Sequence, residues 1–133
     1  MDIEFETIKK RIIEDLNCEA IILFGSFARG TQNERSDIDI AFKSKREVTK
    51  KESFTEKSLL EDIAKRDIDL VNLDEINDDF RYEILMNGKE LYCEDKTKFD
   101  LYKLDMFREY LDLNESRIQI MDRVKKGGTI YGK

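Results

Sequence analysis

The chain has 133 residues, of which 41% are charged and 40% hydrophobic, and its formal net charge is −6. This length suits one domain with a modest core, which we expect to span residues 1–133. The negative charge argues against a protein that coats a nucleic-acid backbone, and we expect no direct binding to nucleic acid.

The chain contains no histidine and only two cysteines, Cys18 and Cys93. Without imidazole there is no histidine general base and no histidine-ligated zinc, so any metal must be a hard, oxygen-ligated ion such as Mg²⁺. The two thiols stand far apart and outside any CxxC pattern, so we expect free, buried or half-buried cysteines of a cytoplasmic protein. No long apolar run suggests insertion into a membrane.

The first quarter of the chain predicts a helix, a buried strand and a turn. Residues 3–16 have helical periodicity, with an apolar stripe formed by Phe5, Ile8, Ile12 and Leu16. Residues 20–24 form a short continuous apolar run, which is typical of a strand buried on both faces. Gly25-Ser26 ends this run, residues 27–29 form a short helix, and residues 31–36 are a polar loop.

The next segment alternates between polar and apolar residues and predicts a half-buried strand over 37–43. Residues 43–51 are basic and aperiodic, which indicates a mobile loop. A helix follows over 53–65, with Ser53 as its N-cap. Its inward residues are expected to be Leu59, Leu60, Ile63 and Ala64.

The second half of the chain predicts two more strands and two helices. Residues 67–73 form the third strand, and Asp74 is the expected N-cap of a helix over 75–86. A short strand over 90–93 precedes a long C-terminal helix over 98–126. The apolar stripe of that helix consists of Leu104, Phe107, Leu111, Ile118 and Met121, and the aromatic residues Tyr102, Phe107 and Tyr110 are expected in the core.

This order of elements predicts an α/β (α+β) fold, in which helices flank a small mixed sheet of about four strands. We expect residues 18–95 to form the core of the domain, with the C-terminal helix packed on it. Residues 129–133 read as a frayed tail.

Three carboxylates are the candidate catalytic and metal-binding residues. Side chains alternate along a strand, so Asp37 and Asp39 project from one face, and Asp69 lies on a strand that is a natural sheet neighbour. Three such groups can hold two Mg²⁺ ions about 3.5–4 Å apart, and Asp69 is also the best candidate for a general base. A lone Asp-x-Asp pair is more often a solvated strand face. An EF-hand is excluded, because its glycine and glutamate positions hold Phe42 and Val48.

The turn at Gly25-Ser26 is the candidate nucleotide-binding element. Gly25 allows close backbone approach, and Ser26 offers a hydroxyl and an N–H group to a phosphate. Arg29 can reach a phosphate or form an ordinary surface ion pair. The turn is neither a Walker loop nor a GxGxxG fingerprint, and alone it reads as an ordinary strand-to-helix turn.

Together, turn and strand resemble the signature of the DNA polymerase β-like nucleotidyltransferase superfamily, here Gly25-Ser26-x-Ala28-Arg29-Gly30 and Ser36-Asp37-x-Asp39. The core of the match covers residues 21–43, with further support out to about residue 93. The small size is similar to the minimal nucleotidyltransferase (MNT) branch of that superfamily, which includes the MntA-type antitoxins.

The resemblance implies an antitoxin that transfers AMP from ATP to a tyrosine hydroxyl of a HEPN-domain ribonuclease toxin. By position, Gly25 and Ser26 bind the triphosphate, while Asp37, Asp39 and Asp69 bind two Mg²⁺ ions. The toxin is expected to dock on the exposed side of the last helix or on residues 43–51. Two alternatives stay open: an antitoxin that acts by direct binding only, and a nucleotidyltransferase whose acceptor is a small molecule or RNA.

Overall fold

The computed structural model describes residues 4–33 and 35–126, with side chains as far as residue 112. Its centre is a four-stranded sheet in the order β3-β2-β1-β4. The strands are β1 (Cys18–Phe24), β2 (Ile38–Ser44), β3 (Ile68–Asn72) and β4 (Lys89–Cys93). β1 runs antiparallel to β2 and β4, whereas β2 and β3 are parallel. The predicted mixed sheet of about four strands is therefore confirmed.

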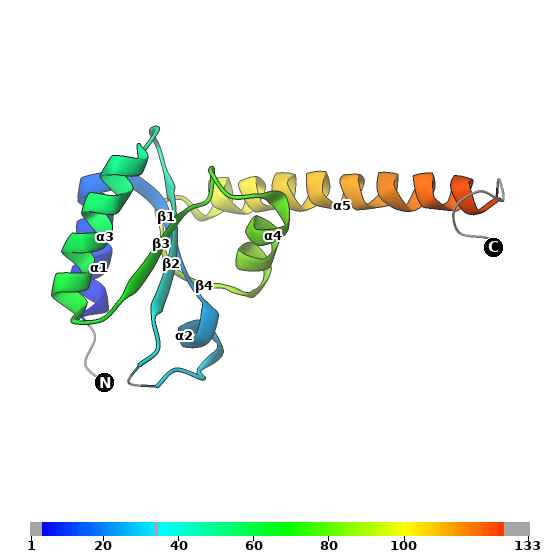
Figure 1. The fold of residues 1–133 in the computed structure, drawn as a ribbon. Helices are drawn as coiled ribbons and strands as arrows, with labels where there is room; N and C mark the ends of the chain where they lie inside the picture. Colours follow the sequence, from blue (N-terminus) through cyan, green and yellow to red (C-terminus); the bar gives the residue numbers. More distant parts are fainter. Residues whose placement is uncertain (1–3, 34, 127–133) are drawn as a thin grey trace.

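Helices cover both faces of this sheet. Helices α1 (Phe5–Leu16) and α3 (Lys50–Ala64) lie on one face, and α4 (Asp78–Asn87) and α5 (Lys96–Lys126) lie on the other (Figure 1). The five-residue helix α2 (Gly25–Arg29) follows β1 directly. Helix α5 continues well beyond the sheet (Figure 1). None of the helices in residues 4–33 and 35–126 is both long enough and apolar enough to cross a membrane.

Each face of the sheet has its own hydrophobic cluster. Ile38, Ile40 and Phe42 of β2 face α1 and α3, while Ala41 of the same strand faces α4 and α5. The apolar run 20–24 is buried against both clusters except at Phe24, as predicted for a central strand. This alternation matters for function, because the same period of two decides on which face Asp39 lies.

The predicted cysteine chemistry and the stripe of α1 are confirmed. Cys18 is buried, Cys93 is half-buried, and both are free thiols. The apolar residues of α1 form its inner face, with Ile8, Ile12 and Leu16 buried and Phe5 partly buried.

The predicted stripe of the last helix is wrong at Leu104 and Leu111, which are 50% and 55% exposed. Phe107 and Tyr102 pack, as expected, against the hydrophobic cluster on the face of the sheet that α4 and α5 cover. Tyr110 stacks on Tyr82. The side of α5 that packs on the sheet instead carries Phe99, Tyr102, Met106 and Phe107, so Leu104 and Leu111 lie outside this contact. The predictions for Ile118, Met121 and the tail 129–133 lie outside the described residues.

Helix α3 begins earlier than predicted. Its N-cap is Thr49, whose side chain accepts a hydrogen bond from the backbone N–H of Glu52, and the Glu52 side chain accepts one from the N–H of Thr49. Ser53 therefore lies within the first turns and caps nothing. The expected mobile loop over 43–51 is also wrong, because its ends belong to β2 and α3, and Val48 between them is only 2% exposed.

Two side chains of α3 and the cap of α4 differ from the sequence prediction. Leu59, expected inside, is 38% exposed, whereas Glu56 is only 3% exposed. Helix α4 is capped by Asn77, whose side-chain oxygen accepts from the N–H of Phe80. Asp74, the predicted cap, instead forms an ion pair with Lys43 at 3.2 Å.

Candidate active site

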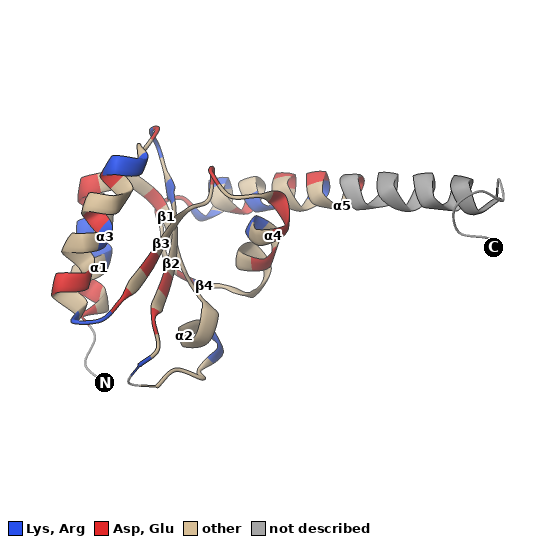
Figure 2. Ribbon diagram, viewed as in Figure 1, with Lys and Arg blue, Asp and Glu red and all other residues tan. Residues whose placement is uncertain are grey.

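The parallel pairing of β2 and β3 brings the predicted carboxylates together. Asp39 is directly opposite Asp69 in the register of the two strands, and Asp37 precedes β2 by one residue. Because Ile38 and Ile40 are buried under α1 and α3, Asp39 must project to the opposite face of the sheet. Figure 2 shows acidic residues on β2 and β3 where these two strands lie side by side.

The surroundings of Asp39 are electrostatically unfavourable for a carboxylate. Partial burial raises its pKa first, and the negative charges of Asp69 and Asp37 raise it further. The nearby positive charge of Arg29 acts in the opposite direction. Asp37 and Asp69 therefore lie close enough to act on Asp39, and a cation at this place would relieve the repulsion that Asp39 experiences.

The chemistry of these oxygen donors fits a hard divalent cation such as Mg²⁺. Among the residues that the structure describes, however, no group of three Asp, Glu, Cys or His side chains is already arranged to hold a metal ion. The assignment of Asp37, Asp39 and Asp69 as metal ligands therefore stays a prediction that rests on their charge and proximity.

Gly25 lies directly against the carboxylate of Asp39. A Cβ atom added to residue 25 would overlap Oδ2 of Asp39 and would lie 2.9 Å from its Cγ. The backbone of Gly25 also has a φ of 70°, in the left-handed region that favours glycine. The turn and the carboxylate thus form one compact unit, which supports their joint assignment to a nucleotide site.

The backbone of the turn is fixed by its own hydrogen bonds. The carbonyl oxygen of Ser26 accepts from the N–H groups of Gly30 and Thr31, which closes the short helix α2. The predicted contacts of Ser26 and Arg29 with phosphate stay untested. Arg29 is close enough to Asp39 to influence its pKa, as a residue of the same site must be.

Sequence reasoning missed Arg66, which holds the loop that precedes Asp37. Its guanidinium donates to the carbonyl oxygens of Asn33 at 2.9 Å and Ser36 at 3.0 Å. It also lies over the ring of Phe27 in α2, 5.4 Å from the centroid. Arg66 thereby connects the start of β3 to both α2 and the loop before β2. No periodicity or motif identifies it, because its partners are backbone atoms about 30 residues away.

A groove of about 300 Å³ adjoins this site between α2 and α4. Phe24, Gly25, Ala28 and Arg29 line one side of it, and Glu83, Ile84, Asn87 and Gly88 line the other. Gly25 and Arg29 belong both to this groove and to the surroundings of Asp39. A ligand in the groove would therefore be within reach of the carboxylates.

The sequence matches the polymerase beta nucleotidyltransferase domain family over residues 6–97. The chain belongs to this family. The matched range contains the turn, all three carboxylates and every strand of the sheet. A comparison with proteins of curated function found no match.

Solved structures of toxin–antitoxin complexes resemble this nucleotidyltransferase over nearly its whole length. One chain of a toxin–antitoxin crystal structure with AMP-PNP is 26% identical, with a TM-score of 0.80, and the match covers 91% of this chain and 98% of that one. A chain of the MntA–HepT toxin–antitoxin complex is 23% identical, with a TM-score of 0.72, over 90% and 94% of the two chains.

A third similar structure is the complex of a tri-AMPylated HEPN toxin from Shewanella oneidensis with an MNT antitoxin. Its matched chain is 23% identical, with a TM-score of 0.67, over 90% of this chain and 97% of that one. At these identities the last two structures establish the shared fold, which is that of polymerase β-like nucleotidyltransferases.

Proposed function

We propose that this nucleotidyltransferase is an antitoxin that transfers AMP from ATP to a tyrosine hydroxyl of a HEPN-domain ribonuclease toxin. The observation that carries the proposal is the pairing of Asp39 with Asp69, beside a glycine turn that touches the Asp39 carboxylate. Support for the nucleotide comes from the 26% identical toxin–antitoxin structure, which contains AMP-PNP. The tri-AMPylated HEPN toxin bound to an MNT antitoxin of the same fold supports the acceptor.

In this mechanism Asp37, Asp39 and Asp69 would hold Mg²⁺ on the face of the sheet away from α1 and α3. When bound, the ions supply positive charge that stabilises the phosphates and lowers the pKa of the attacking hydroxyl. Gly25 leaves room for the Asp39 carboxylate at the turn. Ser26 and Arg29 bind the triphosphate, and Arg66 keeps the loop before Asp37 in place.

At phosphorus the transfer forms one bond and breaks one, and a proton moves from the tyrosine to Asp69. The tyrosine oxygen bonds to the α-phosphorus of ATP, and the bond from that phosphorus to the bridging oxygen of the β-phosphate breaks. Pyrophosphate carries away the bonding electrons, and Asp69 accepts the hydroxyl proton as general base. In this proposal the acceptor hydroxyl is a tyrosine of the partner.

The experiment incubates the purified chain with α-labelled ATP, MgCl₂ and a HEPN-domain protein from the same genome, followed by mass spectrometry of that protein. We expect AMP on a tyrosine with the wild type and none with the double variant Asp37→Ala, Asp39→Ala. A matched double variant, Glu14→Ala with Asp62→Ala, removes two exposed carboxylates elsewhere and should retain transfer. If the wild type adds no AMP to any residue, this proposal is wrong.

Direct binding is the second candidate, and one observation favours it. Helix α5 exposes Leu101, Leu104 and Leu111 by half or more of their surface, which suits a contact with another protein. Growth assays with the toxin separate the two functions. A folded, toxin-binding Asp37→Ala, Asp39→Ala variant that still neutralises the toxin would establish neutralisation by contact, and loss of neutralisation would establish catalysis.

A further inference from the structure

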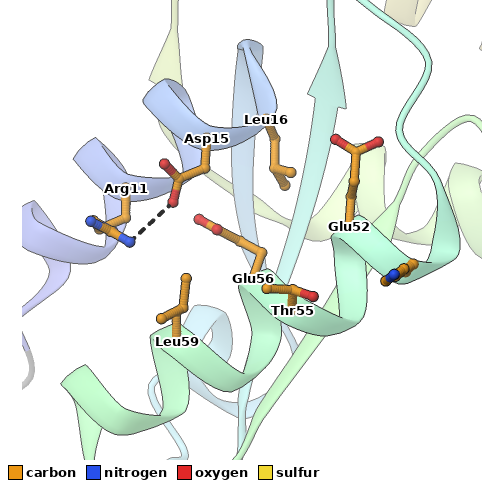
Figure 3. A pocket seen from close by; sticks show the side chains of 8 residues that line it. Arg11, Asp15, Leu16, Glu52, Thr55, Glu56 and Leu59 are labelled. Atoms are coloured by element: carbon orange, nitrogen blue, oxygen red, sulfur yellow. Dashed lines mark ion pairs between the residues drawn. The ribbon is translucent and has the colours of Figure 1, made fainter.

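A second cavity, remote from the carboxylates of β2 and β3, lies between α1 and α3 on the other face of the sheet. Its volume is about 360 Å³. Its lining consists of Arg11, Asp15 and Leu16 of α1 and of Lys51, Glu52, Thr55, Glu56 and Leu59 of α3. Figure 3 shows Glu56 reaching from α3 toward Asp15 and Arg11. Nothing in the proposed transfer reaction uses this cavity.

Glu56 is an incompletely satisfied buried carboxyl group. It is only 3% exposed, and among the described residues its Oε2 atom has no hydrogen-bond partner. Arg11 forms an ion pair with Asp15 at 3.4 Å, yet its own Nε atom is buried without a partner in the same part of the structure. Buried polar atoms without partners are rare in folded proteins, so this cavity has unused capacity for a polar ligand.

The surroundings of Glu56 favour its neutral form. Burial raises its pKa to about 8, and a hydrogen bond to Asp15 and the charge of Asp15 add to this, while Arg11 lowers it. The charge of Glu56 also acts on Cys18 of β1, whose thiol is neutral because burial raises its pKa to about 12. Near pH 7 Glu56 is therefore mostly protonated, and it adds no second negative charge beside Asp15.

We propose that this cavity is a binding site for a primary alkylammonium group, held between the carboxyl groups of Asp15 and Glu56. The ammonium N–H groups donate to the two carboxylates, including the unpartnered Oε2 atom, and the alkyl stem lies against Leu16 and Leu59. Exchange of a proton for a cation leaves the net charge of the cavity unchanged, so binding creates no uncompensated charge.

The lining of the cavity favours an organic cation over a metal ion. Glu52 in its lining is already engaged by Arg46 at 2.7 Å and by the cap of α3. Two carboxyl groups remain, Glu56 and Asp15, of which Asp15 also pairs with Arg11 at 3.4 Å. A divalent ion of the Mg²⁺ or Ca²⁺ type needs more oxygen ligands than these two side chains provide. The exposed side chain of Leu59, which the helical pattern placed inside, becomes the apolar contact for the stem.

Two sources can supply such a group, a free alkylamine or a lysine side chain of another protein. Calorimetry on the full chain at pH 7 distinguishes them with two probes, n-butylammonium chloride and the peptide acetyl-Gly-Lys-Gly-amide. We expect saturable binding with a Kd on the order of 1 mM for the better probe. Binding releases the Glu56 proton, so the heat must differ between buffers of different ionisation enthalpy.

The variant Glu56→Gln keeps the shape of the side chain but holds no exchangeable proton. It should bind the better probe at least about tenfold more weakly and release no proton. Glu14→Gln, on the exposed side of α1, is the matched control and should behave as the wild type. Asp15→Asn provides a second disruption should Glu56→Gln fail to fold, which circular dichroism reports.

Tighter binding of the peptide assigns the site to a lysine of a partner, and tighter binding of butylammonium assigns it to a free amine. Saturation by neither probe, or wild-type binding and proton release in Glu56→Gln, would overturn the proposal. In those cases the Asp15–Glu56 pair is a structural proton link between α1 and α3.

Discussion

Gly25 and Gly30 allow a direct test of the contact between the turn and Asp39. Both glycines have left-handed backbones, with φ of 70° and 73°. An alanine in this region costs about 1–2 kcal/mol because of the contact between its Cβ and its own backbone. At residue 30 the added Cβ meets nothing within 4 Å, so Gly30→Ala should lose only that amount.

At residue 25 the added Cβ also collides with Asp39. It would lie 2.9 Å from Cγ and 3.3 Å from Cβ of the aspartate, and it would overlap Oδ2, so the carboxylate must rotate away. An off-rotamer side chain costs about 0.5–1.5 kcal/mol. We therefore expect Gly25→Ala to lose about 1.5–3.5 kcal/mol of unfolding free energy in urea denaturation, more than Gly30→Ala.

The larger effect should be on catalysis. A reacting group displaced by about 1 Å can cost on the order of 100-fold in rate, and Gly25→Ala forces such a displacement of Asp39. Gly30→Ala should keep transfer within a few-fold of the wild type. If the two variants have equal unfolding free energies and Gly25→Ala transfers AMP as fast as the wild type, a Cβ atom at residue 25 does not displace the Asp39 carboxylate, and the reasoning is refuted.

Three further predictions concern charge, capping and the position of the catalytic loop. The raised pKa of Asp39 means that its ionised form is disfavoured in the folded state, so without divalent ions stability falls as the pH rises through that pKa. Asp39→Asn should therefore raise the melting temperature at pH 7 in EDTA, relative to the wild type, while abolishing transfer. Thr49→Ala should lose about 1 kcal/mol of unfolding free energy in urea, whereas Ser53→Ala should stay within about 0.5 kcal/mol of the wild type. Arg66→Met leaves two backbone carbonyls without their donor, so we expect about 1–3 kcal/mol of lost stability and a lower kcat with little change in KM for ATP, measured by steady-state kinetics.

The sequence by itself predicted the chemistry of the site and the residues that form it. The spacing of Asp37 and Asp39 and the run of apolar residues before Gly25 are local features, because the period of a strand is set by backbone geometry. The placement of Asp69 beside this pair also followed from sequence, since its strand had few possible neighbours in so small a sheet. The register of β2 and β3 then confirmed that Asp39 and Asp69 are opposite each other.

Only the tertiary structure decided which residue caps α3, which of its side chains are buried, and which groups Arg66 contacts. Thr49 and Ser53 are both good caps, and the path of the chain from β2 selected Thr49 by burying Val48. The burial of Glu56 and the exposure of Leu59 depend on how α3 lies against α1, which helical periodicity does not contain. Arg66 acts through backbone carbonyls far away in sequence, and such contacts exist only once the sheet has formed. Local patterns report what a segment prefers, whereas caps, buried charges and long-range donors depend on which neighbours the fold brings near.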